Sequence, residues 1–302
     1  MRGPARPSDD RRPRRTLRAA WRGAAQRPER RRPLKPEYYR RRWRGFYGAL
    51  KYAAREKQLS ADPLDGASDR DWKPPEVVHA VDRRRVPNPK QVGALLEAVR
   101  KVGRTQGPRL VAVFGCMYYG MLRPSEAVNV RKDDCTLPAS GWGLLEVREV
   151  KSAAGKQWTD DGDVHETRGL KGRPVDTVRP VPIPPELVEL LRAHLDEYGP
   201  RPDGWLFRTY KDGVYQPSTL WRVLDMARGK AFTATQAKTP LARKPYDFRH
   251  AGVSWRLNSG VPPTQVAEWA GHSVEVVLKI YAKVIAGQDR VWEGLIDDAL
   301  GD

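Results

Sequence analysis

The sequence predicts a mainly α-helical protein with a small antiparallel β-sheet, an α+β fold that follows a basic amino-terminal region. Three observations lead to this prediction. Apolar residues recur at helical spacing through most of the chain from about residue 88 onward. Two short apolar runs between residues 142 and 184 have the length and composition of strands. Residues 1–34 combine arginine clusters with proline and glycine, and their few aliphatic residues cannot build a core.

Four segments are expected along the chain. Residues 1–34 are predicted to be a flexible basic arm, and residues 35–60 a short helical segment. Residues 61–83 are rich in proline, aspartate and glycine, which is typical of a linker. Residues 84–302 form the large domain, which ends in an amphipathic helix.

Residues 36–58 are expected to form one amphipathic helix. Its apolar face carries Tyr39, Trp43, Phe46, Tyr47 and Leu50. Its remaining surface carries Arg40, Arg41, Arg42 and Arg44. A solvated face of an ordinary helix would also be charged, but this density of arginines favours a surface that binds a polyanion.

The large domain is expected to consist of helices with a β insertion. A helix starts at Asn88, and further helix over residues 110–130 is interrupted at "GMLRPSE". Strands are expected at 142–150, 178–184 and 205–209, and the prolines of the second place it at a sheet edge. The remaining helices are expected at residues 184–199, 217–232, 246–258, 264–270, 274–285 and 289–299.

The composition points to a nucleic-acid partner. The formal net charge is +18 and the pI about 10.1, and phosphate backbones bind such surfaces through Coulomb attraction and counterion release. An anionic membrane surface is the competing partner. A GC-rich genome would also enrich arginine, alanine, glycine and proline without any functional reason.

Other classes of protein are disfavoured by the sequence. The two cysteines, Cys116 and Cys135, form no CxxC pair, so neither a disulfide framework nor a structural metal site is expected. The apolar run Leu110–Leu122 is too short to span a bilayer and reads as a buried helix. The arginine-rich start lacks the apolar stretch of a signal peptide, and we expect a soluble intracellular protein.

The stretch "GMLRPSE" contains a possible anion site. Pro124 suits the first turn of a helix, which places Arg123 at the helix amino terminus beside free N–H groups. Glu126 lies three residues on and can pair with Arg123 and orient it. A surface ion pair is the alternative interpretation of this motif taken alone.

A second motif, "RKPYDFRHAG", starts another helix after Pro245. Tyr246 and Arg249 are three residues apart and therefore share a face. A phenol donor beside a guanidinium group could hold a phosphate. The alternative is a solvated arginine beside a half-buried tyrosine.

The stretch "GHSVEVVLKIYAKV" has the pattern of a helix with one buried face. Val274, Val277, Leu278 and Tyr281 are spaced as i, i+3, i+4 and i+7. This periodicity alone predicts that all four side chains are part of the core.

A tight turn precedes this stripe. Gly271 is expected to end one helix, Ser273 can cap the next, and His272 is thereby held between them. The helix–turn–helix pattern over residues 264–285 also resembles a reader of the DNA major groove.

The order of these motifs is more informative than any one of them. Gly-x-x-Arg-x-x-Glu, a β insertion with lysines, Tyr-x-x-Arg-His, Gly-His and then a tyrosine follow one another along the chain. In this order the sequence resembles the tyrosine recombinases, the phage-integrase family of site-specific DNA recombinases. The resemblance covers about residues 84–285 and, more weakly, the helical segment before it.

The resemblance implies specific roles. Arg123 and Arg249 would clamp the scissile phosphate, and His272 would donate a hydrogen bond to it. Tyr281 would be the nucleophile, leaving a 3′-phosphotyrosyl bond, and the surrounding cations are expected to favour its phenolate form. Tyr246 stands where the family usually has histidine, which we expect to tune the rate rather than abolish activity.

The remaining chemistry is expected from a lysine. In the family a lysine of the β insertion protonates the leaving 5′-oxygen; Lys171 is our choice, with Lys151 and Lys156 as weaker candidates. Glu126 would orient Arg123. The bond energy stays in the covalent intermediate, so the resemblance implies no metal, no ATP and no other cofactor.

The resemblance also implies partners. These are double-stranded DNA at attachment sites, a homotetramer assembled on that DNA, and accessory excision or DNA-bending proteins, in the bacterial cytoplasm near the nucleoid. Residues 35–60 would be a partial core-binding segment, shorter than is usual in the family. The last helix could dock on a neighbouring protomer or pack on its own domain.

Three alternatives remain open at this point. The chain could be a catalytically decayed integrase, since Tyr246 and the short amino-terminal region are what decay could leave. It could be a helix-turn-helix regulator, although a regulator gives no reason for Arg123 and Arg249. A type IB topoisomerase uses similar chemistry, but the order of the motifs disfavours it.

Overall fold

The computed structural model describes most of the chain after its first 35 residues. The described residues are 36–65, 81–153, 165–169, 177–285, 293, 294, 297, 298 and 300. The chain divides into two compact units, Met1–Val78 and His79–Asp302, and each is described by itself.

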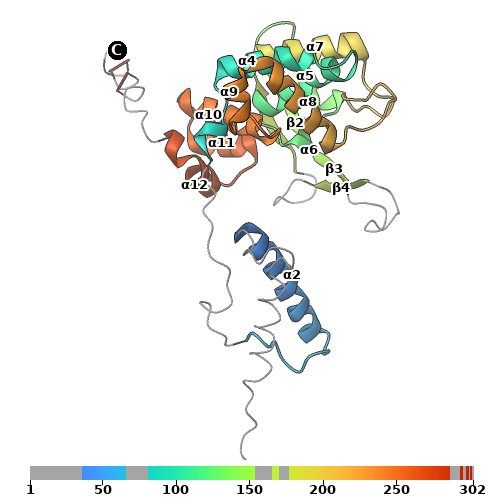
Figure 1. The fold of residues 1–302 in the computed structure, drawn as a ribbon, viewed down its shortest axis with the longest axis vertical. Coiled ribbons are helices and arrows are strands. Elements are labelled where there is room, and N and C mark those ends of the chain that lie inside the picture. The colour runs from blue at the N-terminus through green and yellow to red at the C-terminus, as the bar shows by residue number, and fades with distance from the viewer. Residues whose placement is uncertain are drawn as a thin grey trace, which may run out of the picture. The chain divides into compact units, whose positions relative to one another are not determined.

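Helices dominate the described residues of both units (Figure 1). The first unit contributes α2 (Pro36–Arg55). The helices of the second unit are η1 (Arg83–Arg85), α4 (Pro89–Arg100), α5 (Gln106–Tyr118), α6 (Pro124–Ala127), η2 (Lys132–Asp134), α7 (Pro185–Tyr198), α8 (Pro217–Ala231), α9 (Ala234–Lys238), α10 (Tyr246–Asn258), α11 (Pro263–Ala270) and α12 (Val274–Ile285). Its strands are β1 (Cys135–Thr136), β2 (Gly143–Val147), β3 (Glu149–Ala153), β4 (His165–Gly169) and β5 (Arg179–Ile183).

Helix α2 has the predicted amphipathic character. The aromatic face is half-buried, and the rings of Trp43 and Tyr47 stack with centroids 4.9 Å apart. The side chains of Arg41, Arg42 and Arg44 are exposed. The arginines and the aromatic residues therefore occupy different faces, as their spacing predicts.

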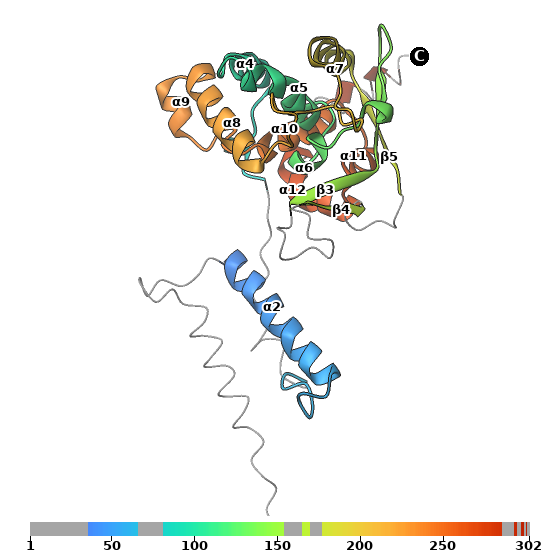
Figure 2. The same cartoon turned by 90° about the vertical axis from the view of Figure 1, so that its right-hand side faces the viewer.

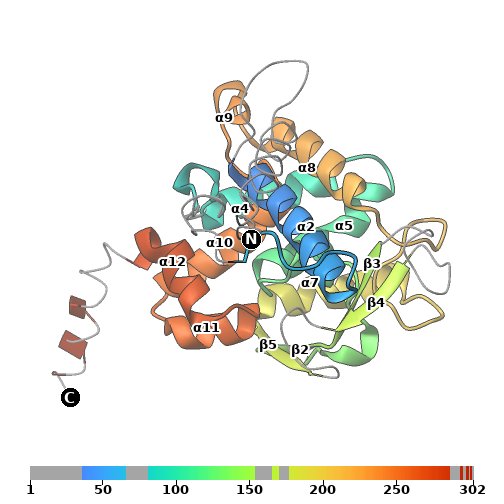
Figure 3. The same cartoon turned by 90° about the horizontal axis from the view of Figure 1, so that it is seen from below.

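The β structure is small and antiparallel, as predicted, but it forms two sheets. Strands β1, β2 and β5 form one sheet with β2 in the middle, and β3 pairs with β4 in the other. The predicted strand at 142–150 is therefore split, because β2 ends at Val147 and β3 turns away to pair with β4. The β3–β4 hairpin extends from the edge of the helical body (Figure 3).

Strand β5 lies at the edge of its sheet, as its prolines predict. Val181 and Ile183 point into the core while Pro180 is exposed, which is the alternation of a half-buried strand. The predicted strand at 205–209 was wrong. Only Trp205 makes a bridge there, to Arg131, and the chain then leaves the extended pairing.

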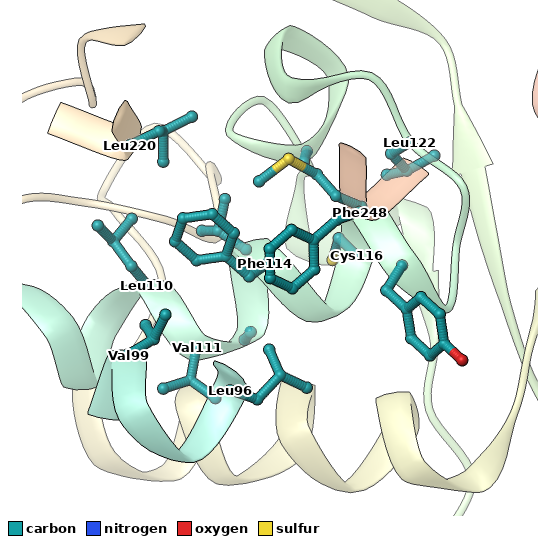
Figure 4. Close-up of a cluster of buried hydrophobic side chains, with 14 of the residues drawn as sticks. Leu96, Val99, Leu110, Val111, Phe114, Cys116, Leu122, Leu220 and Phe248 are labelled. Atoms are coloured by element: carbon teal, nitrogen blue, oxygen red, sulfur yellow. The ribbon is translucent and has the colours of Figure 1, made fainter. Parts of the chain in front are cut away.

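Helix α5 is at the centre of the main core. It is flanked by α4, α7, α8 and α10 (Figure 2), and ten of its thirteen residues are buried, which confirms the prediction of a buried helix. Figure 4 shows Phe114 of α5 facing Phe248 of α10, with ring centroids 5.0 Å apart, among Leu110, Leu122 and Leu220. This packing holds α10 against α5.

A second apolar cluster joins α10, α11 and α12. It includes Val253, Val266, Val277 and Tyr281. The prediction that the whole stripe of α12 is buried was wrong, because Val274 is 39% and Leu278 47% exposed. Of this stripe only Val277 and Tyr281 reach the cluster, so α12 contacts its neighbours through a narrower face than the periodicity predicts.

Within the described residues, no helix combines the length and apolar character needed to cross a bilayer.

At Gly252, α10 packs against the backbone at the end of α5 with no room for a side chain. A Cβ atom at this position would lie 1.9 Å from the carbonyl oxygen of Tyr118. Gly252→Ala is therefore expected to lower the free energy of unfolding by about 3 kcal/mol, since overpacking forces backbone shifts. Urea unfolding of the full chain measures this loss.

The matched control is Gly229→Ala in α8, where a Cβ would meet no atom within 4 Å. It should leave the stability unchanged or raise it by up to about 1 kcal/mol, because alanine favours helix more than glycine does. Equal stabilities for the two variants would contradict the close packing at Gly252.

Candidate active site

The Arg-x-x-Glu motif lies at the start of the short helix α6. Arg123 is the N-cap residue and Pro124 the first helical residue, as their order predicts. The carboxylate of Glu126 accepts from the backbone N–H of Arg123 at 2.8 Å and from its Nη1 at 2.5 Å. Nη2 of Arg123 donates to the carbonyl oxygen of Gly271, so both terminal nitrogens are held, and the side chain is still partly exposed to solvent.

Glu126 is buried among three guanidinium groups. Besides Arg123, it pairs with Nη2 of Arg179 at 2.7 Å and lies 3.7 Å from Nη1 of Arg249. Burial by itself would raise the pKa of Glu126, but the charges of Arg179, Arg249 and Arg123 outweigh it and lower the pKa to about 2. The carboxylate is therefore ionised and holds the cations together.

The end of helix α11 provides further acceptors for these arginines. Three consecutive carbonyl groups there each accept from a different guanidinium. The pairs are Trp269 with Arg179 at 2.5 Å, Ala270 with Arg249 at 2.5 Å, and Gly271 with Arg123 at 2.7 Å. Carbonyls at a helix carboxyl end lack partners within the helix and carry the negative end of its dipole, which favours cations.

The side chain of Arg249, which belongs to α10, is completely buried. Its Nη1 donates to the carbonyl oxygen of Met121, a residue held at φ 52° in the left-handed region that side chains rarely adopt. Its Nε has no hydrogen-bond partner among the described residues. Burial lowers the pKa of Arg249, and its charge remains because the ordinary value of arginine is so high.

The turn after α11 has the predicted form. Gly271 takes a left-handed conformation at φ 63° and ends the helix, and Ser273 Oγ accepts from the N–H of Val276 at the start of α12. A Cβ at Gly271 would also come within 3.2 Å of the Arg179 guanidinium. His272 is thereby held between the two helices.

The imidazole of His272 contacts Arg249. Its Nε2 lies 2.9 Å from Nη2 of Arg249, and because arginine only donates, this nitrogen accepts and the ring proton is on Nδ1. Burial, together with the charges of Arg249 and Arg123, lowers the pKa of His272 to about 3. The ring is therefore neutral, and its Nδ1–H is the donor that it has left.

Tyr281 is on α12, in the apolar cluster that joins α12 to α10 and α11, and its side chain is only 1% exposed. Its hydroxyl is 2.8 Å from Nδ1 of His250. Burial raises the pKa of Tyr281, and the opposing charge of Arg249 does not offset it. The charge of Arg249 favours the phenolate, as expected, but the loss of hydration on burial outweighs it.

Tyr246 and His250 occupy successive turns of α10. Their rings meet edge to face with centroids 4.9 Å apart, and the guanidinium of Arg249 lies 5.7 Å from the Tyr246 ring. Tyr246 and Arg249 thus share a face, as their spacing predicts. Tyr246 has no described hydrogen bond to Tyr281.

The structure brings six of the predicted site residues together. These are Arg123, Glu126, Tyr246, Arg249, His272 and Tyr281, all around the turn between α11 and α12. Lys171 and Lys156 lie outside the described residues, and Lys151 is placed on β3 only by its backbone. Arg40, Arg41, Arg42 and Arg44 are on α2, in the other unit.

Two residues of this cluster were not identified from the sequence. Arg179 opens strand β5 and is completely buried against Glu126, but nothing in "RPVPIP" distinguishes it from an exposed edge residue. His250 follows Arg249 directly, and consecutive helical residues do not share a face, so spacing offered no signal for it. The histidine is the last residue of the Tyr-x-x-Arg-His motif, but no role was assigned to it.

This arrangement is suited to bind an anion beside a hydroxyl nucleophile. Arg123, Arg249 and His272 offer donors, and Tyr281 supplies the hydroxyl. Among the described residues, no group of three histidine, cysteine, aspartate or glutamate side chains is placed to hold a metal ion.

Comparison with known proteins places the large domain in a family. The model of the phage integrase family matches residues 86–287. No curated protein matches the chain.

Several solved structures share the fold. The Tn1549 transposon integrase in complex with transposon right end DNA is 16% identical, with a TM-score of 0.58 over 82% of this chain and 75% of that one. The same integrase in complex with circular intermediate DNA is 15% identical, with a TM-score of 0.62 over 98% and 89%. XerH site-specific recombinase in a post-cleavage complex with a palindromic difH substrate is 15% identical, with a TM-score of 0.55 over 95% and 72%.

Proposed function

Because the chain belongs to the phage integrase family, we propose that it is a site-specific DNA recombinase that cuts and rejoins DNA through a 3′-phosphotyrosyl bond on Tyr281. The observation that carries this proposal is the convergence of the Tyr281 hydroxyl with Arg123, Arg249 and His272 at one turn. Nothing else about the fold requires a tyrosine hydroxyl and three nitrogen donors to meet in a buried, ionised cluster.

The scissile phosphate binds through the donors that the cluster leaves unused. These are the buried Nε of Arg249, the solvent-facing part of Arg123 and the Nδ1–H of His272. Charge builds on the non-bridging oxygens during attack, and guanidinium groups stabilise it most when they are already positioned. Glu126 and the three carbonyls of α11 hold them in position.

Strand transfer then proceeds without a metal or ATP. Tyr281 attacks phosphorus, the 5′-oxygen leaves with a proton from Lys171, and a 5′-hydroxyl of a partner strand later reverses the step. Because Tyr281 is buried in the free chain, DNA binding must uncover its hydroxyl. The arginines of α2 contact the DNA backbone in this proposal, in line with the net charge of +18.

We also propose a biological setting, in a phage or other mobile element. The family match and the likeness in fold to the Tn1549 transposon integrase, which is in complex with transposon right end DNA, support this proposal. The chain acts in the cytoplasm on attachment sites, as a homotetramer on DNA.

A covalent adduct tests this proposal. The substrate is a duplex selected from a random-sequence pool by binding to the full chain, then nicked at successive positions so that cleavage releases a short fragment. Wild type is expected to form an adduct that survives SDS, and mass spectrometry of the trapped peptide should place the nucleotide on Tyr281.

Two outcomes would contradict the proposal. An adduct on another residue would exclude Tyr281 as the nucleophile. Specific binding without any adduct, at every nick position, would mark the chain as a DNA-binding protein without strand transfer.

A further inference from the structure

His250 has a contact that the proposed function does not use. Its Nδ1 lies 2.8 Å from the Tyr281 hydroxyl, and their rings are 5.8 Å apart at 58°. The ring is half-buried on α10, next to Arg249 in sequence. A side chain at this position touches the atom that would form the new bond to phosphorus.

The nucleophile needs an acceptor for its proton. Burial raises the pKa of Tyr281 above the ordinary value of 10.0, so the phenol remains protonated near neutral pH. Attack by the hydroxyl must therefore release a proton while the bond to phosphorus forms. None of the cations in the cluster can accept it, because arginine has no lone pair to offer.

His250 is in the form that can accept a proton. Burial, with the charges of Arg249 and Arg85, lowers the pKa of His250 to about 4, so the imidazole is neutral at pH 7. A phosphodiester bound at Arg249 would bring a negative charge beside the ring, and an opposite charge raises the pKa of an imidazole. Substrate binding thus moves His250 toward the range in which a base is effective.

We propose that His250 is the general base of strand cleavage and accepts the proton of Tyr281 through Nδ1. This inference rests on the proposed function. Nδ1 is then the acceptor for the phenol in the resting chain, and Nε2 carries the ring proton. The charge of Arg249 acts on His250, and His250 contacts the hydroxyl that attacks the phosphate, so a phosphate held by Arg249 lies close to the His250 ring.

The atoms and electrons of the step balance. The Tyr281 oxygen bonds to phosphorus as the P–O5′ bond breaks, and the phenolic proton moves to Nδ1, leaving an imidazolium. The 5′-oxygen departs with the electron pair of the broken bond and takes a proton from Lys171, the acid of the proposed function. In religation the imidazolium returns its proton to the tyrosine oxygen, as microscopic reversibility requires.

Tyr246 does not fill this role. It stands where the family usually has histidine, but a phenol is poorly suited to take up a proton near pH 7, and no hydrogen bond joins it to Tyr281 in the described structure. Alternatively, His250 could only hold Tyr281 in a resting position. In that case its removal would speed cleavage rather than slow it.

The test compares two substitutions with wild type on the nicked duplex described above. His250→Asn keeps an oxygen near the place of Nδ1 that can accept a hydrogen bond but cannot take a proton. His250→Phe removes both functions. Adduct formation in a single turnover is expected to fall about 100-fold or more in both variants, the usual contribution of a positioned base.

The dependence on pH separates a base from a structural role. At pH values above the pKa of His250, the rate of adduct formation by wild type should not depend on the titration of this histidine. In His250→Asn, the proton of Tyr281 must instead leave to solvent. The variant rate is therefore expected to rise about tenfold per pH unit toward alkaline pH. The charged and titratable groups around His250 are Tyr246, Arg249, Arg85, His272 and Tyr281, and both variants retain them.

A sulfur substitution tests where the proton acts. A 5′-bridging phosphorothiolate leaves without protonation, so it should restore cleavage to Lys171→Ala but not to His250→Asn. Rescue of His250→Asn would assign the histidine to the leaving group and overturn the inference.

The control is His194→Asn in α7. His194 is also buried and its pKa is also lowered to about 4, because of burial, but it lies in the main core away from the cluster. The His194→Asn variant should form the adduct at the rate of wild type. Thermal unfolding of every variant checks that it is folded. If wild type forms the adduct and His250→Asn does so at the same or a higher rate, the inference fails while the proposed function stands. If wild type forms none, the proposed function fails.

Discussion

Tyr281→Phe is expected to bind the selected duplex with unchanged affinity and to form no covalent adduct. The substitution removes one oxygen atom, which is the atom that would bond to phosphorus. The ring stays in the cluster with Val253, Val266 and Val277, because phenylalanine fills the same space. The variant thus separates the chemistry of the site from its assembly.

The loss of the hydroxyl should cost little stability. It removes one hydrogen bond, to His250, and such a bond contributes about 1 kcal/mol. Binding is measured by electrophoretic mobility shift and adduct formation by denaturing gel, on the same duplex. An adduct from the Tyr281→Phe chain would refute the assignment of the nucleophile.

Tyr215→Phe is the matched control. Tyr215 is likewise buried, and its hydroxyl has no hydrogen-bond partner among the described residues. Removing that hydroxyl should leave both binding and adduct formation as in wild type. If the loss of any buried tyrosine hydroxyl abolished adduct formation, Tyr215→Phe would lose it as well.

Glu126→Gln is expected to destabilise the large domain by about 3–5 kcal/mol at pH 7. The substitution preserves shape but removes the negative charge that Arg179 and Arg249 face in the interior. Breaking a buried ion pair leaves an uncompensated charge, which is far more costly than losing a surface pair. Urea unfolding of the full chain measures the difference.

The pH dependence of this difference has a defined sign. The pKa of Glu126 is lowered from 4.5 to about 2 in the folded chain, so the folded state favours the ionised form. Its contribution is fully present above about pH 4.5 and is lost as the pH falls toward 2, a change on the order of 3 kcal/mol. The stability gap between wild type and Glu126→Gln should therefore be constant near neutrality and narrow in acid.

Glu97→Gln provides the surface comparison. Glu97 pairs with Arg100 at 3.8 Å, and both side chains are at least half exposed. A pair of this kind contributes less than about 1 kcal/mol, and its removal should not change the acid dependence. Equal losses for Glu126→Gln and Glu97→Gln would contradict the buried network.

Most of the fold could be predicted from local patterns. The buried run Leu110–Leu122, the edge strand over residues 178–184 and the helices from Pro217 to Ile285 follow from period, composition and capping residues. The failures have a common cause. "WLFRT" has strand-like residues but finds no partner strand, and strand pairing depends on distant segments. Val274 and Leu278 fit the stripe of α12, but its neighbours cover only part of it.

The order of the motifs predicted most of the site. The residue that it missed lies outside any motif. Arg123, Glu126, Tyr246, Arg249, His272 and Tyr281 stand in recognisable motifs, whereas Arg179 belongs to an ordinary strand. The partners of Arg179 are in α6 and at the end of α11, 53 positions before it and 90 after it. Burial of Tyr281, by contrast, was predicted by the stripe of α12, and the structure confirms it with a side chain that is only 1% exposed.

The carbonyl acceptors at the end of α11 bear on how the protein folds. They are separated from Arg123, Arg179 and Arg249 by 148, 90 and 21 positions, so the three guanidinium groups find these partners only once remote segments have met. Contacts of such long range form slowly, which makes the site a late product of folding. Conversely, a local opening of α11 would release all three arginines in a single event. Amide hydrogen exchange at this helix would therefore report on the competence of the whole site.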